Sequence, residues 1–162
     1  EPLKSITKLS QKEAFLIAEK LYKENPCRAH NRFSPEFFPN YYQYRLETEK
    51  WLYKKFIQLG GEPKTKNPFY FVLHYCEIFY ENFNHGIETK IRLNDIDKSN
   101  ISFTFGDSMA MMDSKERKNP FDKNKLMEYI DLNDGNVVKF IDSIKLKYNC
   151  IEAQLWTDKY FL

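Results

Sequence analysis

The amino-acid sequence predicts an α+β fold in which a small mixed β-sheet of about four strands packs against helices, after a helical N-terminal third. Two patterns carry this prediction: apolar residues at helical spacing dominate the first third of the chain, and short apolar or alternating runs follow it. With 42% hydrophobic and 30% charged residues, the 162-residue chain has the composition of a folded protein. No repeat or linker divides it, so we expect a single domain over residues 1–162.

The first predicted helix has sequence signals at both ends. Ser10 and Glu13 form a capping box in front of a run of apolar residues at helical spacing, and Asn25-Pro26 stops that run. Residues 27–33 then show no hydrophobic period, so we expect them to form an ordered loop.

A long second helix should follow this loop. Pro39 has no amide hydrogen to donate to a helical ladder, so we expect one short turn over residues 35–38 and a helix capped by Asn40. Gly60-Gly61 should end this helix, because glycine readily takes the left-handed conformation that closes helices.

The rest of the chain alternates between predicted strands and helices. In the run Phe69–Tyr75, apolar residues occupy both the odd and the even positions. This is typical of a strand covered on both faces, so we expect it at the centre of the sheet. Thr89–Leu93 and Ile101–Phe105 alternate like strands with one polar face, and residues 150–156 should form the last strand. Further helices are expected over Glu77–Asn84, after the cap Asp122, and from Val137.

Composition argues against several classes of protein. A net charge of +2 does not indicate a nucleic-acid surface, and no stretch approaches the roughly 18 to 20 apolar residues of a membrane span. The chain has three cysteines at distant positions, Cys27, Cys76 and Cys150. An odd number and wide spacing do not suit a disulfide framework or a zinc site, so we expect free thiols, no structural zinc and a cytoplasmic location. No cofactor is indicated, because the common nucleotide and hydrolase motifs are absent.

The densest group of potential ligand-binding side chains is Arg28, His30 and Arg32, with Arg45 in the next predicted helix. A guanidinium offers forked donors to a phosphate or carboxylate, and an imidazole adds a donor that titrates near neutral pH. We therefore predict that these residues bind an anionic ligand. The alternative is that they cap helix ends and pair with nearby glutamates, as most surface arginines do.

Aromatic residues flank this charged segment. Phe33 ends it, and Tyr41 and Tyr42 follow in the next predicted helix. A loop with such neighbours could form one wall of a pocket, and loops carry binding sites more often than core segments do.

Two acidic residues are the other candidates. Glu152 lies in the middle of the last predicted strand beside Gln154 and Trp156, where a buried carboxylate needs a partner or a cleft. The alternative is a strand at the sheet edge, with Glu152 facing water. Asp107 follows the third predicted strand, where sites often gather, although Gly-Asp is also an ordinary turn sequence.

The order of these features loosely resembles that of ADP-ribosyltransferase-like domains. The shared features are an early Arg/His segment, a late strand glutamate and a central strand containing Pro68, Tyr70, Phe71 and Leu73. The resemblance covers this layout and no diagnostic motif, and here the Arg/His segment lies between helices rather than on a first strand. In such domains the Arg or His anchors a dinucleotide and the glutamate stabilises an oxocarbenium-like centre. The resemblance implies these roles for Arg28 or His30 and for Glu152.

Three functions remain open from the sequence. The least favoured is nucleic-acid binding through the lysine-rich stretches 64–66 and 115–118, because the net charge is close to neutral. The favoured one is a small intracellular enzyme or binding domain for an anionic ligand that contains phosphate or is a nucleotide. Its cations Arg28, His30 and Arg32 would face Glu152 or Asp107 across a cleft, with Glu152 and His30 as the candidate catalytic groups. The alternative is a non-catalytic protein-interaction module, such as an inhibitor or immunity-type protein, whose exposed aromatic residues form a partner surface.

Overall fold

The computed structural model describes residues 5–24, 28–82 and 88–160, and it confirms the α+β fold. The α-helices of the described residues are α1 (Gln11–Glu24), α2 (Phe38–Gln58), α3 (Glu77–Asn82), α4 (Lys123–Asp131) and α5 (Val137–Tyr148). The strands there are β1 (Phe69–Val72), β2 (Ile101–Phe105) and β3 (Ile151–Leu155). Short 3-10 helices are η1 (Ile6–Lys8), η2 (Arg28–Phe33), η3 (Leu93–Asp95) and η4 (Lys98–Asn100).

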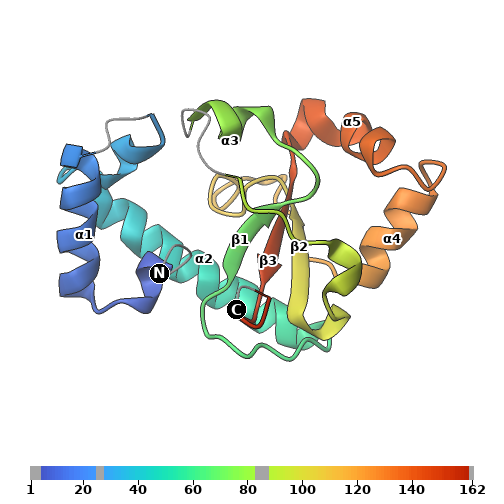
Figure 1. Cartoon of the computed structure of the whole chain (residues 1–162), viewed down its shortest axis with the longest axis horizontal. Helices are drawn as coiled ribbons and strands as arrows, with labels where there is room; N and C mark the ends of the chain where they lie inside the picture. The colour runs from blue at the N-terminus through green and yellow to red at the C-terminus, as the bar shows by residue number, and fades with distance from the viewer. Residues whose placement is uncertain (1–4, 25–27, 83–87, 161–162) are drawn as a thin grey trace.

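The sheet has the order β1-β3-β2, and both strand pairs are antiparallel (Figure 1). The predicted class is therefore confirmed, but the described sheet has three strands rather than about four and is not mixed. Two placements were wrong. The strand that begins at Phe69 lies at an edge, and the strand that carries Glu152 is the central one.

The strand predicted at Thr89–Leu93 is also absent from the structure. Residues 88–92 have no regular secondary structure, and η3 follows them. The ammonium group of Lys123 donates to the backbone carbonyls of Leu93 (2.8 Å) and Ile96 (2.7 Å). A side chain therefore takes the acceptors that a neighbouring strand would use. Ile91 and Leu93 still pack against the core, which accounts for the apolar alternation in this segment.

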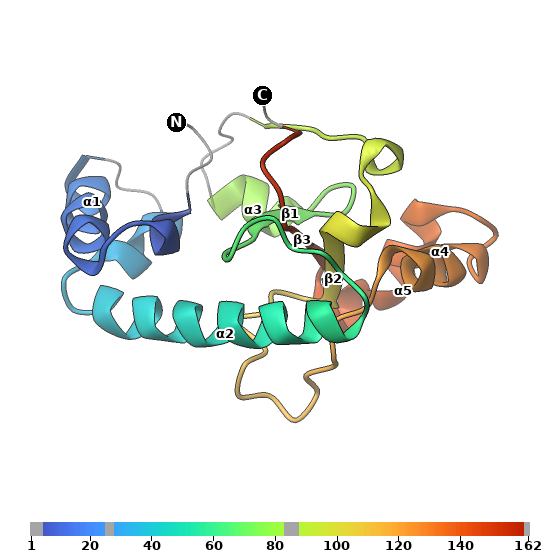
Figure 2. The ribbon, with the colours of Figure 1, turned by 90° about the horizontal axis from the view of Figure 1, so that it is seen from below.

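One face of the sheet is apolar and packs against α4 and α5. The strand register places Phe71, Phe103 and Ala153 on this face. They belong to the same cluster as Leu126 of α4 and Phe140 of α5, which we call the sheet core. Figure 2 shows α4 and α5 beside β2, at the end of the molecule remote from α1.

The opposite face of the sheet is polar at its centre and is covered by α2. Phe56 of α2 stacks on Trp156, just after β3, with ring centroids 5.2 Å apart and an interplanar angle of 10°. Leu52, one turn earlier in α2, joins the same buried cluster. The aromatic and aliphatic contacts at this end of α2 shield the polar centre of the sheet from water.

The N-terminal half of α2 extends beyond the sheet to α1 (Figure 1). Ala14 and Ala18 of α1 pack there against Phe38 and Tyr42 of α2, in a third hydrophobic cluster that we call the α1–α2 cluster. The two buried alanines leave room for the α2 rings. The long helix α2 thus contributes both to this cluster and to the Phe56–Trp156 cluster at the sheet.

Several helix ends are those that local sequence predicts. The Ser10 hydroxyl accepts from the Glu13 amide (3.3 Å), and the Glu13 carboxylate accepts from the Ser10 amide (3.0 Å), which confirms the capping box. Asp122 caps α4 by accepting from the Lys125 amide (2.8 Å). Gly60, just after α2, has a φ of 82°, as its predicted role requires.

Two predictions about the segment before α2 were wrong. Arg28–Phe33 forms η2 rather than a loop, and α2 begins at Phe38 rather than after Asn40. Pro39 is tolerated because it lies in the first turn of α2, where an amide has no intrahelical acceptor. The Ser34 hydroxyl instead accepts from the amide of Phe37, the residue before α2 (3.3 Å).

Candidate functional site

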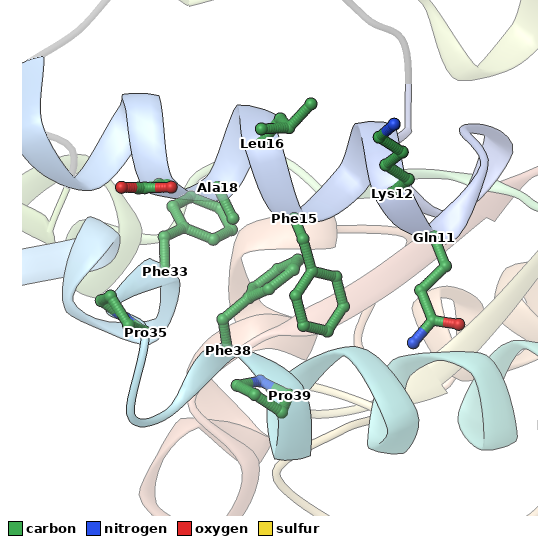
Figure 3. A pocket seen from close by; sticks show the side chains of 10 residues that line it. Gln11, Lys12, Phe15, Leu16, Ala18, Phe33, Pro35, Phe38 and Pro39 are labelled. Atoms are coloured by element: carbon green, nitrogen blue, oxygen red, sulfur yellow. The ribbon is translucent and has the colours of Figure 1, made fainter.

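A pocket opens between α1 and the segment that joins η2 to α2 (Figure 3), with a volume of about 680 Å³. Phe15 of α1 and the residues Phe33 and Phe38 form its aromatic walls. The volume and the mostly apolar lining are those of a small-molecule site. Of the three aromatic residues that the sequence placed near a pocket wall, Phe33 lines this pocket, whereas Tyr41 and Tyr42 do not.

The aromatic walls are fixed by contacts among the rings themselves. The centroids of Phe15 and Phe38 lie 4.9 Å apart with an interplanar angle of 75°, and those of Phe33 and Phe38 lie 5.9 Å apart at 61°. Such edge-to-face pairs are favourable, because the positive edge of one ring meets the negative face of the next. The pocket wall therefore has a defined shape before any ligand binds.

The charged groups at this pocket are not balanced. Glu19 of α1 lines it, but its carboxylate is paired with Lys23 at 2.6 Å, and that hydrogen bond and charge lower the pKa of Glu19. Lys12 also lines the pocket, and within the described residues no acidic side chain pairs with it. Lys12 is thus an exposed lysine of the pocket lining that has no acidic partner among the described residues.

Arg32 lies close to this pocket. Its guanidinium group stands over the rings of Phe33 (5.9 Å) and Tyr41 (5.5 Å). The side chains of Arg28 and His30 lie outside the described part of the structure, although both residues belong to η2. The predicted basic segment therefore meets the pocket at Phe33, and Arg32 approaches it through its contact with the Phe33 ring.

Arg45 is held inside the protein. Its guanidinium donates to Glu49 (3.1 Å) and to the Tyr41 hydroxyl (2.9 Å), and it lies 4.5 Å from the ring centroid of Tyr70. Burial disfavours the charged form, but Tyr41, Tyr70 and Glu49 outweigh it and raise the pKa of Arg45. Asn67 donates to the second oxygen of Glu49 (2.6 Å). Arg45 thus has an internal counter-charge, as the alternative interpretation of the sequence expected.

Glu152 is buried in the central strand β3, so the edge interpretation was wrong. Its carboxyl accepts from the Gln154 amide group (2.9 Å) and lies near the Thr104 hydroxyl (3.5 Å) and the Ser108 amide (3.4 Å). Burial, together with the neighbouring charge of Asp107, raises the pKa of Glu152 to about 7. Glu152 does not line the pocket at α1.

The polar groups around Glu152 form a chain of buried hydrogen bonds. The Trp156 indole donates to Ser102 (3.0 Å), Ser102 donates to Gln154 (2.9 Å), and Gln154 donates to Thr104 (2.9 Å) as well as to Glu152. This chain explains how a polar sheet face can be buried, since its members satisfy one another.

Asp107 has a local structural role beside Glu152. Its carboxylate accepts from the backbone amides of Met109 (2.8 Å) and Ala110 (3.1 Å), which is the side-chain-to-backbone pattern of a turn. The turn interpretation of Asp107 is therefore confirmed, and its predicted contact with a ligand stays a prediction.

Comparison of the chain with protein-family models, with curated proteins and with solved structures finds no match. Within the described ranges, no group of three or more His, Cys, Asp or Glu side chains could hold a metal ion. None of the described helices combines the length and apolar character that a membrane crossing requires.

Sequence reasoning missed Lys12 and Phe15 as pocket residues. Phe15 shares the helical spacing of the core residues, so nothing in the sequence distinguishes its pocket face. Lys12 could have been singled out from the sequence, because no acidic residue lies three or four positions away from it on α1 to form an ion pair with it. Lys23, by contrast, has Glu19 at that spacing and pairs with it.

Proposed function

We propose that this protein is a binding domain for a small anionic molecule with an aromatic or aliphatic body, of about the size of a mononucleotide. The observation that carries the proposal is a mostly apolar pocket with aromatic walls whose lining includes Lys12, a lysine with no acidic partner among the described residues. An ammonium group attracts a carboxylate or phosphate, and the aromatic walls accept the apolar part of the same molecule.

The aromatic walls favour a ligand that has a flat ring. Phe15 and Phe33 are partly exposed at the pocket, and the buried ring of Phe38 packs behind them. Stacking of a nucleobase on an aromatic side chain contributes roughly 1–3 kcal/mol, which exceeds the contribution of a single exposed ion pair. The apolar contacts should therefore supply most of the affinity and Lys12 the preference for an anion.

The basic residues of η2 support the same proposal. Arg28 and His30 stay predicted ligand contacts on sequence grounds, and Arg32 already stands beside Phe33. The proposal is one of binding, since Glu152 is buried in the sheet and does not line the pocket. The cytoplasmic location predicted from the cysteine spacing belongs to the proposal as well.

A protein partner is the second candidate, and two exposed side chains favour it. Leu16, which lines the pocket, is 59% exposed, and Phe37, which precedes α2, is 57% exposed. Apolar residues next to an aromatic pocket could receive an aromatic anchor of another protein. In that case the pocket would respond to a peptide or protein and to no small anion.

Thermal unfolding with a small set of ligands tests the proposal. Adenosine monophosphate, phenyl phosphate and octanoate combine an apolar body with an anionic group, whereas adenosine lacks the charge and inorganic phosphate lacks the body. A ligand at about 100 times its dissociation constant stabilises the fold by roughly 2.7 kcal/mol, or roughly 5–10 °C for a chain of this length. We expect such a shift from at least one amphipathic anion, and much less from adenosine or phosphate.

Matched variants connect the shift to this pocket. Lys12→Gln should remove the preference for the anion, while Lys54→Gln, at an exposed position of α2, should leave it intact. Leu16→Ser should weaken binding through the apolar body, while Leu146→Ser, at a side chain that is 99% exposed on α5, should not. The proposal is wrong if no amphipathic anion stabilises the protein, or if Lys12→Gln and Leu16→Ser leave the shift unchanged.

A further inference from the structure

The two edges of the sheet differ in how they are covered. At the outer edge of β2, Phe103 exchanges two backbone hydrogen bonds with Phe121, one from each amide to the other carbonyl (2.9 Å each). Along the outer edge of β1, the described residues form no further strand or bridge. Every residue of β2 and β3 is buried, whereas three of the four residues of β1 are only half-buried. The edge of β1 is therefore the open one.

Alternate residues of β1 direct their backbone groups to this open edge. The Leu73 amide donates to the Ile151 carbonyl of β3 (2.9 Å), so the antiparallel register makes the odd-numbered residues of β1 those that share hydrogen bonds with β3. Tyr70 and Val72, the even-numbered residues, direct their amides and carbonyls away from β3. In the described part of the chain, no hydrogen bond is found to the backbone of either residue. Donors and acceptors that repeat at every second residue are what an added β-strand pairs with.

A groove with lysine side chains adjoins the start of this edge. Its volume is about 460 Å³, and it is lined by Thr7, Lys8, Leu46, Thr65, Lys66 and Asn67. The Lys8 ammonium lies 3.9 Å from the centroid of the Phe69 ring, which places the groove at the first residue of β1. Lys66 is exposed and forms no ion pair with a described side chain, and none of the described lining residues is acidic. The groove is therefore positively charged.

We infer that the open edge of β1 is an interaction surface that binds an extended segment of another protein as an added antiparallel strand, followed by acidic residues in the groove. The backbone groups of Tyr70 and Val72 would pair with the amides and carbonyls of this segment. Because an antiparallel segment runs opposite to β1, the residues that follow its extended part lie beside Phe69 and the groove. Acidic side chains at that end would meet Lys66 and Lys8.

The shape of the molecule favours a thin partner over a second copy of the chain. Helix α1 and the N-terminal half of α2 project beyond the β1 side of the sheet (Figure 1). A second copy would bring the same projecting helices to the edge, whereas an extended segment needs only the width of one strand, about 4.8 Å. Glu77 lies in the first turn of α3, past the other end of β1, so the acidic residues belong at the groove end alone. This surface shares no lining residue with the pocket at α1, and the inference does not depend on the ligand proposed there.

Hydrogen exchange measured by NMR on the full chain tests the inference. The probe is a synthetic peptide of about eight residues in which valine and threonine alternate and aspartates follow. In the free protein the Tyr70 and Val72 amides should exchange faster than the Phe71 amide, which faces β3. At about 100 times its dissociation constant, the peptide should slow both by up to about 100-fold, because only about 1% of the protein is then free. The Lys115 amide, in the turn after β2 and also without a hydrogen bond to a described residue, should keep its rate.

Matched changes separate the backbone contacts from the charges. Titration calorimetry should show that Lys66→Glu weakens binding of the peptide by roughly 5-fold, while Lys54→Glu, at an exposed position of α2, leaves it unchanged. The same peptide ending in lysines should bind more weakly than the one ending in aspartates. A peptide N-methylated at alternate amides cannot donate along the edge and should not bind.

Several results would overturn the inference. One is slow exchange of Tyr70 and Val72 in the free protein, which would show that the edge is already covered. Another is a peptide that fails to bind, or binds without slowing these two amides. Slowing that rises with protein concentration in the absence of peptide would assign the edge to a second copy of the chain. Equal binding of the peptides that end in lysines and in aspartates would remove the groove from the site.

Discussion

The carboxyl group of Glu152 makes the stability of this fold depend on pH. Its pKa is about 7 in the folded protein, against an ordinary value of 4.5, because of burial and the nearby Asp107. Below the ordinary value Glu152 is protonated in both states, and stability is fully present. Between pH 4.5 and about 7 the folded state keeps a proton that the unfolded chain has lost, so stability falls over this range and levels off above it.

Glu152→Gln should remove this loss. At pH 8 we expect the variant to exceed the parent protein in unfolding free energy by up to about 3 kcal/mol, and the difference should shrink toward pH 5. Urea unfolding at several pH values measures it. Glu128→Gln, at an exposed residue of α4, is the matched control and should not alter the pH profile. A parent protein that is equally stable at pH 5 and pH 8 would show that Glu152 has an ordinary pKa.

At the scale of single residues, the sequence indicates which side chains are unusual but not their distant partners. The pairing of Arg45 with Glu49 follows from their spacing on one helix, whereas its contact with Tyr70 depends on tertiary structure. In the same way, the burial of Glu152 requires the hydroxyl of Thr104 on a neighbouring strand. Alternation along one strand cannot reveal a polar network that crosses strands.

At the scale of elements, two glycines allow a matched test of backbone conformation. Gly60 and Gly106 have positive φ values of 82° and 73°. A Cβ at Gly60 would meet nothing within 4 Å, whereas a Cβ at Gly106 would lie 3.2 Å from the Tyr148 carbonyl oxygen. Gly60→Ala should therefore cost only the left-handed conformation, about 1–2 kcal/mol, and Gly106→Ala should cost more.

Urea unfolding of both variants at one pH measures these costs. Asn133→Ala, in the turn after α4, is the control, because Asn133 is a turn residue without a positive φ. Equal losses at Gly60 and Gly106 would mean that the contact with Tyr148 relaxes freely.

Helix ends were predictable from sequence because their determinants are local. The capping box at Ser10, the cap at Asp122 and the stop at Gly60 each involve residues within a few positions of one another. Strand order was not predictable in this way. The apolar run at Phe69 predicts a central strand, yet β1 is an edge strand. Its two faces are nevertheless covered by helices and side chains, which explains the apolar run.

At the scale of the whole molecule, the two hydrophobic clusters to which α2 contributes should differ in stability. Phe38 belongs to the α1–α2 cluster, and Phe56 packs with Trp156 next to the sheet. Phe56→Ala should lower the global unfolding free energy by about 3–5 kcal/mol. Phe38→Ala should mainly ease the local opening of α1, because its contacts are remote from the sheet.

Native-state hydrogen exchange separates these two effects. In Phe38→Ala the α1 amides should exchange faster while those of β3 keep their protection, and in Phe56→Ala both should change. Faster exchange of β3 in Phe38→Ala would show that the two clusters unfold as one unit. The prediction of a single domain over residues 1–162 stays open to the same experiment.

The position of β3 in the sheet also constrains the order of events during synthesis. Phe69 of β1 and Ile101 of β2 both pair with Leu155, and neither strand pairs with the other. Until the ribosome has released the segment around Leu155, the two earlier strands therefore have no partner for their backbone groups. Such long-range pairing slows folding and leaves apolar strands exposed on the nascent chain. We expect the chain to depend on chaperones until its central strand arrives.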